Sequence, residues 1–179
     1  MRNEWWTPAE LRARVLAEHR IVLDAAACAQ SKLVDEYLGP DHQLPGRRDA
    51  LAFDHWHDLV DHALGDCEGA PAVVWLNAPY LPSKTLYEFL GRAVATAAAG
   101  TTVLALVPSA TGTRWWWDHV LDGGGSVEFL RGRLAFTGPH AGSGSATVAP
   151  WACALVTWRP PPQPGGQRRS AAPTPTCSG

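Results

Sequence analysis

Four consecutive residues, Asn77, Ala78, Pro79 and Tyr80, carry the groups of this sequence best suited to act together in chemistry. The side-chain oxygen of Asn77 and the backbone carbonyl of Ala78 can both accept hydrogen bonds from one amino group, and the ring of Tyr80 offers a face for a planar ring. Such a turn suits an exocyclic amine on a flat base. An ordinary β-turn is the alternative, because Asn and Pro are common in turns.

The segments on either side of this turn indicate where it lies. Residues 72–76 form an apolar run with two valines, which predicts a buried central strand that ends at Asn77. A helical pattern over 85–99 leads to a second apolar strand at 101–107, and Ser109 then places a small polar group beside the turn. In open α/β sheets, ligands bind at the carboxyl ends of the strands. We therefore expect a site at this edge of the sheet.

The N-terminal part predicts a helix and the first strand. Thr7 is expected to cap a helix over residues 9–17, with Pro8 at its first position and Glu10 completing a capping box. A β-branched apolar run that ends at Asp24 predicts the strand. Asp24 could cap the following turn or accept a hydrogen bond from a ligand, and the residues alone leave both open.

Four further segments have less distinct patterns. A short helix is possible over 32–38, and a short strand within 49–56 could precede another helix. Residues 127–136 predict a hairpin or a bent strand around Gly132. The run 149–158 predicts the last strand.

The Asn77 turn resembles the Asn-Pro-Pro-Tyr motif of amino-group methyltransferases that use S-adenosylmethionine, and it is most similar to that of phage-type DNA N6-adenine methyltransferases. Other short matches follow in the order of that family, over residues 4–158: Thr7-Pro8, Leu23-Asp24, a Thr-x-Thr-Arg-Trp-Trp segment at 111–116, Gly132-Arg133 and the strand at 149–158. The resemblance implies an α/β, Rossmann-like methyltransferase fold. Its mostly parallel sheet would carry helices on both faces and a C-terminal β-hairpin.

The resemblance also implies a site for the cofactor S-adenosyl-L-methionine. Thr7 and Pro8 would lie against the cofactor, and Asp24 would accept a hydrogen bond from its ammonium group. Ala25 stands where the family has proline, in the segment that begins the cofactor site. Two acidic residues compete for the ribose hydroxyls: Asp49 and Asp54.

Basic and aromatic residues near the second strand are candidates for binding DNA. Three adjacent tryptophans occupy 115–117, and side chains at consecutive helix positions point about 100° apart, so the three cannot all face one core. At least one is expected to meet a ligand, a partner or solvent. Arg114 and Trp115 are our candidates for DNA backbone and base contacts. Arg131 and Arg133 are two more, although solvated strand edges often carry basic residues.

The activity that the resemblance implies is direct methyl transfer to the N6 amino group of adenine in DNA. The base would be flipped out of the duplex and stacked on Tyr80, with its amino group held by Asn77 and the Ala78 carbonyl. Ala78 keeps that carbonyl, but it loosens the turn relative to the family's proline. Two alternatives stay open: an amino-group methyltransferase acting on RNA or protein glutamine, and a catalytically silent relative that binds nucleic acid.

Length, charge and composition restrict the domain organisation and the functions that these hypotheses allow. With 179 residues, the chain predicts one domain at 1–159 and a disordered Pro/Gly/Ser-rich tail at 160–179. The net charge of −2 gives no overall basic footprint, so a local patch must hold DNA. A run of His and Asp at 54–62 matches no zinc signature, a solvated helix face is favoured, and we expect no metal. Four scattered cysteines and the lack of a membrane-length apolar run predict a cytoplasmic protein. The resemblance implies that the cell is bacterial or phage-infected.

Overall fold

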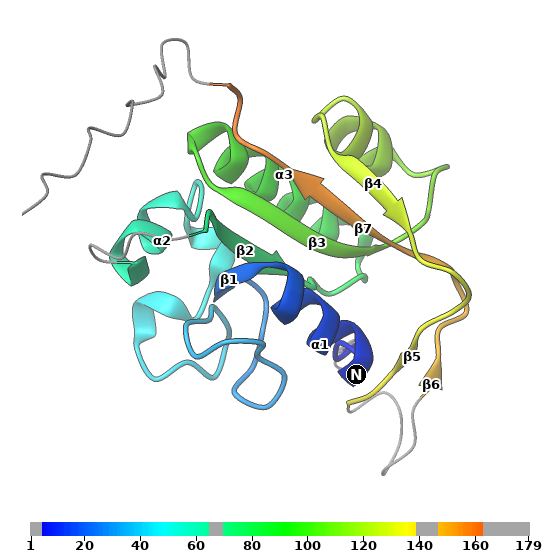
Figure 1. Cartoon of the computed structure of the whole chain (residues 1–179), viewed down its shortest axis with the longest axis horizontal. Helices are drawn as coiled ribbons and strands as arrows, with labels where there is room; N and C mark the ends of the chain where they lie inside the picture. Colours follow the sequence, from blue (N-terminus) through cyan, green and yellow to red (C-terminus); the bar gives the residue numbers. More distant parts are fainter. Residues whose placement is uncertain (1–4, 65–69, 139–146, 163–179) are drawn as a thin grey trace, which may run out of the picture.

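A mixed sheet of five strands forms the centre of the fold, in the order β1-β2-β3-β7-β4 (Figure 1). The computed structural model describes residues 5–64, 70–138 and 147–162. Strands β1, β2 and β3 run parallel, whereas β7 lies antiparallel between β3 and β4. The bounds of the five strands are Arg20–Asp24 (β1), Ala72–Leu76 (β2), Thr102–Pro108 (β3), Ser126–Phe129 (β4) and Cys153–Trp158 (β7).

Helices cover both faces of this sheet, as predicted. In Figure 1, α1 (Ala9–Glu18) lies in front of the sheet and α3 (Ser83–Ala99) lies behind it. The helix α2 (His57–Leu64) packs beside β1 and β2. A π-helix, η3 (Trp116–Leu121), follows β3 and packs on α3. The α/β class with a Rossmann-like arrangement is therefore confirmed, although two of the four strand pairings are antiparallel.

The middle strands are apolar because both of their faces are covered. Val74 and Trp75 of β2, Ala105 of β3 and Val156 of β7 are all completely buried. Side chains in such strands have no solvated face, so the alternation of polar and apolar residues disappears. The first polar side chain after β2 is that of Asn77, which therefore lies at the sheet edge where the buried strand ends.

Three local predictions near the N-terminal half are wrong. Thr7 does not cap α1: Pro8 is the N-cap residue, and no side chain caps it. Residues 32–38 form no helix, because this segment instead runs beside β1 and makes a bridge between Tyr37 and Asp24. The expected strand within 49–56 is a 3₁₀ turn, η2 (Ala50–Ala52), which Asp49 begins.

The segment 127–136 is not a hairpin. Its first half is β4, which pairs with β7, and its second half is β5 (Ala135–Phe136), which pairs antiparallel with β6 (Thr147–Val148). The chain changes sheets at Gly132, whose φ of 78° lies in the left-handed region that glycine adopts easily. The predicted C-terminal antiparallel pair is thus present, but β5 and β6 form it.

The remaining expectations concern membrane-spanning helices, a metal site in the histidine run and the C-terminal tail. No helix in the described part of the chain is long and apolar enough to cross a membrane. Within that part, no three His, Cys, Asp or Glu side chains gather as a metal site. The side chains of residues 61–64 lie outside the described part, and so do residues 163–179 of the predicted tail.

Candidate active site

A cavity of about 140 Å³ opens at the carboxyl ends of β1 and β2. This is the edge at which the sequence places Asn77. The residues that line it come from the N-terminal segment, the loop after β1 and the turn after β2: Trp5, Trp6, Thr7, Asp24, Ala26, Ala27, Cys28, Ser31, Pro40, Trp75, Asn77, Ala78 and Pro79. The fold therefore brings together five of the predicted site residues, which are up to 72 positions apart: Thr7, Asp24, Asn77, Ala78 and Pro79.

The side-chain amide of Asn77 is held in one orientation by three hydrogen bonds. Its Nδ2 donates to the carbonyl oxygen of Trp5 at 2.7 Å and to Oγ1 of Thr7 at 3.2 Å. A carbonyl oxygen can only accept, so the atom that faces Trp5 must be the amide nitrogen. The amide oxygen Oδ1 therefore points the other way, where it accepts from the Tyr80 hydroxyl at 2.9 Å. An amide oxygen has two lone pairs, so it can accept one further hydrogen bond.

The carbonyl of Ala78 is the second acceptor of the turn. Among the described residues, no hydrogen bond is made to its oxygen. The Ala78 side chain itself is buried, with 4% of its surface exposed, so the methyl group packs into the core below the turn. The turn thus keeps two acceptors, the Ala78 carbonyl and one lone pair of Asn77, beside the cavity.

Tyr80 is buried in a group of aromatic rings. Only 4% of its surface is exposed, and its ring makes edge-on contacts with Phe136 and Trp151 at centroid distances of 6.2 and 5.9 Å. Burial, together with the nearby Cys153 thiol, holds the pKa of Tyr80 well above its ordinary value. The hydroxyl therefore stays protonated and serves as a hydrogen-bond donor to Asn77.

Asp24 lines the same cavity at the end of the neighbouring strand, β1. Its two carboxylate oxygens accept from the backbone N–H groups of Ala26 and Leu33, at 3.3 and 3.0 Å. Burial raises the pKa of this carboxyl to about 6, and the two backbone hydrogen bonds and the charge of Arg12 counteract part of that rise. Asp24 thus fixes the loop after β1 and also provides the buried carboxylate that lines the cavity.

The other predicted cofactor residues lie apart from the cavity. Asp49 caps η2 by accepting from the N–H of Leu51 at 2.9 Å, and Asp54 is almost fully exposed, with its carboxylate 3.9 Å from Arg92. Ala25 is buried behind the cavity wall, and Pro8 begins α1. Among the described residues that form the lining, none of these four is present.

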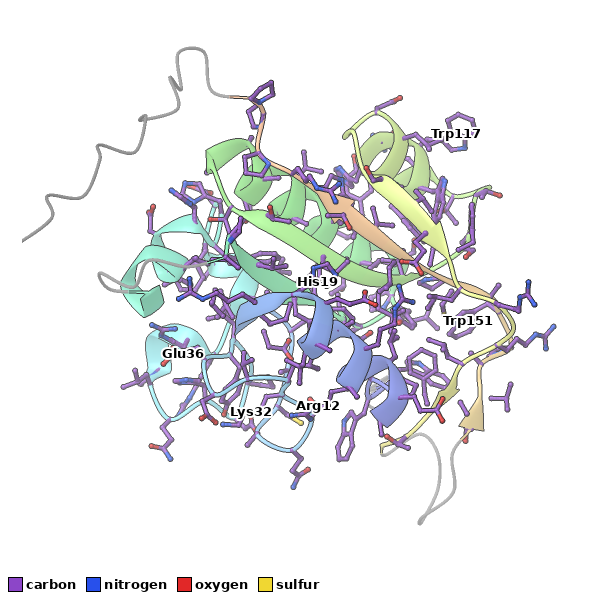
Figure 2. The ribbon with its side chains drawn as sticks, viewed as in Figure 1. Arg12, His19, Lys32, Glu36, Trp117 and Trp151 are labelled. Atoms are coloured by element: carbon purple, nitrogen blue, oxygen red, sulfur yellow. The ribbon has the colours of Figure 1, made fainter. Side chains whose placement is uncertain are left out.

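The predicted DNA-contacting residues differ in exposure. Arg114 is largely exposed, and its guanidinium bonds Asp118 at 3.0 Å and lies 5.4 Å from the ring of Tyr87. Trp115, however, is buried with 3% of its surface exposed, and the surface tryptophan of the three is Trp117, at 55%. Figure 2 shows Trp117 projecting outward from η3. The surface assignment of Trp115 is therefore wrong: the π-helical turn packs Trp115 and Trp116 inward.

Two arginines on the bend between the sheets are fully available to a partner. Arg131 and Arg133 are both exposed, and neither forms an ion pair with another residue in the described part of the chain. They flank Gly132, where the chain leaves β4 for β5. Nearby in sequence, Glu128 is paired with Arg14 at 2.7 Å, so its charge is compensated elsewhere.

Several lining residues were missed from the sequence. Trp5 contributes through its backbone carbonyl, which no sequence pattern reveals, and Trp75 sits in β2 like any core residue. Cys28 and Ser31, which hydrogen-bond each other at 3.3 Å, enter the wall because the loop after β1 folds back on Asp24. Their proximity depends on long-range packing and had no local signal.

A Rossmann-like sheet, a cavity at the carboxyl ends of its parallel strands and a turn whose residues 77–79 line that cavity match the amino-group methyltransferases that the sequence resembles. A family model described as DNA N-6-adenine-methyltransferase (Dam) matches residues 1–169. The chain belongs to this family. It is thus a DNA methyltransferase that transfers a methyl group from S-adenosylmethionine to the N6 amino group of adenine.

Similarity to individual proteins is more distant. A precorrin-6y C5,15-methyltransferase from Geobacter metallireducens has a TM-score of 0.43 at 14% identity, over 87% of this chain and 91% of that one. A precorrin 8w decarboxylase from Methanobacterium thermoautotrophicum has a TM-score of 0.40 at 13% identity, over 85% and 90% of the two chains. No curated protein matches the sequence.

The residues around the cavity fit one end of the cofactor. Asp24 is a buried carboxylate of the kind that pairs with an ammonium group, and the neighbouring Ala26 and Ala27 leave space beside it. Pockets that enclose a whole drug-sized ligand measure roughly 300–1,000 Å³. The cavity is about 140 Å³, so it has room for part of S-adenosylmethionine only.

Proposed function

We propose that the turn from Asn77 to Tyr80 is the catalytic centre of this adenine methyltransferase. The observation that carries the proposal is the fixed orientation of the Asn77 amide, whose nitrogen is held by Trp5 and Thr7 and whose oxygen faces Tyr80. This arrangement offers acceptors, and only acceptors, to an incoming amino group. An adenine N6 amino group has two hydrogens, which match the Asn77 oxygen and the Ala78 carbonyl.

Each residue of the turn then has a distinct task. Asn77 and the Ala78 carbonyl accept the two N6 hydrogens, which aligns the nitrogen lone pair along one direction. Tyr80 donates to Asn77 and keeps the amide from rotating, and Pro79 fixes the backbone between them. S-Adenosylmethionine supplies the electrophilic methyl group when it is bound. Asp24 would hold its ammonium group, with Thr7 and Pro8 on the same side of the cavity and Ala25 behind it.

The substrate and the remaining contacts complete the proposal. Arg114, Arg131 and Arg133 would contact DNA phosphates, because all three are exposed cations. Either Asp49 or Asp54 would reach the cofactor ribose only if the loops that carry them move. One domain at 1–159 performs the reaction, in the cytoplasm of a bacterial or phage-infected cell, where DNA is found.

The test is methyl transfer from labelled S-adenosylmethionine to unmethylated DNA. Asn77→Ala removes one acceptor and is expected to lower kcat by about 10²–10³-fold, the loss typical when one preorganised polar group is removed from a reaction centre. Nucleoside analysis should find the label on adenine N6. Calorimetric binding of S-adenosylhomocysteine should stay within about twofold, because Asp24 is untouched.

The control is Glu88→Gln, which changes an exposed side chain on α3 that does not line the cavity. This variant should transfer methyl groups at the unsubstituted rate. If Asn77→Ala kept most of the transfer rate, the assignment of the turn would be wrong. If it lost S-adenosylhomocysteine binding as well, Asn77 would serve the cofactor and not the base.

A further inference from the structure

Residues 5–7, which lead into α1, are held by a part of the molecule outside the central sheet. Trp6 forms an antiparallel bridge with Thr137, at the end of β5, and its N–H donates to the Thr137 carbonyl at 3.1 Å. In Figure 1 the chain that enters α1 accordingly lies next to β5. We call Trp5, Trp6 and Thr7 the N-terminal strap. All three line the cavity, so β5 supports one of its walls.

The ring of Trp5 is anchored at the same small sheet. It contacts Phe136 of β5 at a centroid distance of 5.4 Å and Trp151, which follows β6, at 5.5 Å. Both contacts are edge-on, an arrangement that aromatic pairs favour. Figure 2 shows Trp151 on the side of the molecule that carries β5 and β6. Anchoring this ring fixes the position of the Trp5 carbonyl, which accepts from Nδ2 of Asn77.

The same two rings support the opposite end of the Asn77 amide. Tyr80 donates its hydroxyl hydrogen to the amide oxygen, and its ring contacts Phe136 and Trp151 at 6.2 and 5.9 Å. We call Phe136 and Trp151 the aromatic anchor. The groups on both sides of the amide, the Trp5 carbonyl and the Tyr80 hydroxyl, therefore depend on one aromatic anchor.

Gly138 completes the contact between β5 and the N-terminal strap. Its φ of 105° lies in the left-handed region, and a Cβ atom added to it would lie 2.8 Å from Cγ of Trp6. Carbon atoms that are not bonded are optimally about 3.5–4.0 Å apart. The Trp6 ring thus occupies the space that any other residue at position 138 would need, and the strap packs directly on the glycine backbone.

We propose that the small sheet β5–β6 fixes the orientation of the Asn77 amide. The positioning residues are Phe136 and Gly138, at β5, and Trp151, which follows β6. None of the three is among the described residues that line the cavity, so each acts through the N-terminal strap or through Tyr80. This inference rests on the proposed catalytic role of Asn77.

The orientation of the amide then depends on how the two sheets dock. Asn77 follows β2 of the central sheet, whereas the aromatic anchor belongs to the second sheet. An amide that turns over exchanges its donor and acceptor ends, and it would present Nδ2 to the amino group of the substrate. The fraction of molecules with the correct orientation sets kcat, so loosening the contact between the sheets lowers the rate.

Gly138→Ala tests this role most directly, because the added methyl group pushes against Cγ, the first atom of the Trp6 ring. The displaced strap no longer holds the Trp5 carbonyl at hydrogen-bond distance from Asn77. We expect kcat at saturating DNA and S-adenosylmethionine to fall about tenfold, the loss of one neutral hydrogen bond. Alanine in the left-handed region should also lower the melting temperature by a few degrees.

Gly124→Ala is the matched control. Gly124, between η3 and β4, has a φ of 73°, and among the described residues no atom apart from its chain neighbours lies within 4 Å of the place that its Cβ would occupy. The variant has the same kind of backbone strain but displaces no neighbour. Its melting temperature should fall to a similar extent, and its kcat should be unchanged. A merely structural role of Gly138 would leave kcat unchanged in both variants.

Combining Gly138→Ala with Asn77→Ala tests whether the glycine acts through the amide. Effects of independent sites on the rate multiply, whereas a residue that acts only through Asn77 has nothing left to orient once the amide is removed. The double variant should therefore transfer labelled methyl groups at the same residual rate as Asn77→Ala alone. A further tenfold loss in the double variant would contradict the positioning role.

The outcomes separate this inference from the catalytic assignment. Equal kcat values for Gly138→Ala and Gly124→Ala would overturn the positioning role, even if Asn77→Ala is nearly inactive. An Asn77→Ala protein that kept the unsubstituted rate would overturn the role of Asn77 and, with it, this inference. The expected result is a lower kcat in Gly138→Ala alone of the two glycine variants, with no further loss when Asn77 is already replaced.

Discussion

Asp24 and Asn77 end neighbouring parallel strands and line the same cavity, but their surroundings differ in kind. Asp24 is an acid whose two oxygens accept from backbone N–H groups, and burial raises its pKa to about 6. Asn77 is neutral, and the carbonyl and hydroxyl groups around it fix which end of its amide faces each way. This difference supports the proposed roles, in which Asp24 holds a cation and Asn77 accepts from an amino group.

The charge of Asp24 should make folding stability depend on pH. A folded-state pKa of about 6, above the ordinary 3.8, means that the folded protein binds the proton more tightly than the unfolded chain does. The stabilisation by this group is complete below about pH 3.8 and is lost as the pH rises through 6. The difference between 3.8 and about 6 corresponds to roughly 3 kcal/mol in the free energy of unfolding.

Denaturant unfolding of the protein and of Asp24→Asn, from pH 4 to 7.5, measures this contribution. The stability of the unsubstituted protein should fall relative to that of Asp24→Asn as the pH rises. A constant difference across this range would mean that Asp24 is not desolvated in the folded protein, and the contrast with Asn77 would disappear.

Asp24→Asn should also weaken cofactor binding. The variant is isosteric but has no charge, so it loses a charge-assisted hydrogen bond to the ammonium group. Such bonds contribute about 1.5–3 kcal/mol, which is roughly a 10- to 100-fold increase in Kd for S-adenosylhomocysteine. Isothermal titration calorimetry at pH 7.5 would measure it. Equal affinity of the two proteins would show that the ammonium group lies elsewhere, and Asp24 would then be only the residue that fixes the loop.

Tyr80→Phe tests the neutral side of the comparison. The variant keeps the ring and its contacts with Phe136 and Trp151 but leaves the Asn77 oxygen without its donor. We expect kcat to fall about tenfold, since one neutral hydrogen bond contributes about 0.5–1.5 kcal/mol. Cofactor affinity should be unchanged. A rate equal to that of the unsubstituted protein would mean that Trp5 and Thr7 are sufficient to orient Asn77.

The sequence predicted the strands and the position of the Asn77 turn because both depend on local patterns. The apolar runs that end at Asp24 and Asn77 are buried strands, and the polar residue after each one lies at the sheet edge. In contrast, the environment of each side chain depends on distant contacts. Residues 32–38 read as a helix, but they follow β1 because Asp24 and Tyr37 pair through their backbones.

The three tryptophans at 115–117 show the same limit. Helical geometry predicted that at least one of them meets solvent, a ligand or a partner, and Trp117 is exposed. Which ring is exposed depends on how the segment packs on α3, and those contacts come from residues far away in the sequence. Sequence periodicity therefore predicted an exposed ring correctly, but the choice of Trp115 was wrong.

Thr7 is the residue where local and long-range interpretations diverge most, and it provides the last and smallest test. The local pattern Thr-Pro-x-Glu predicted a helix cap, whereas the structure uses the Thr7 hydroxyl as an acceptor for Asn77, 70 positions away.

Thr7→Val keeps the shape of the side chain and removes that acceptor. A cap contributes about 1 kcal/mol to stability, so loss of a cap would lower the melting temperature and leave the rate unchanged. Loss of an acceptor for Asn77 should instead lower kcat about threefold, because the Trp5 carbonyl still holds the other amide hydrogen. Thr7→Ser is the control that keeps the hydroxyl, and it should restore kcat. A lower melting temperature with normal kcat in Thr7→Val would remove Thr7 from the machinery and leave Trp5 alone in orienting the amide.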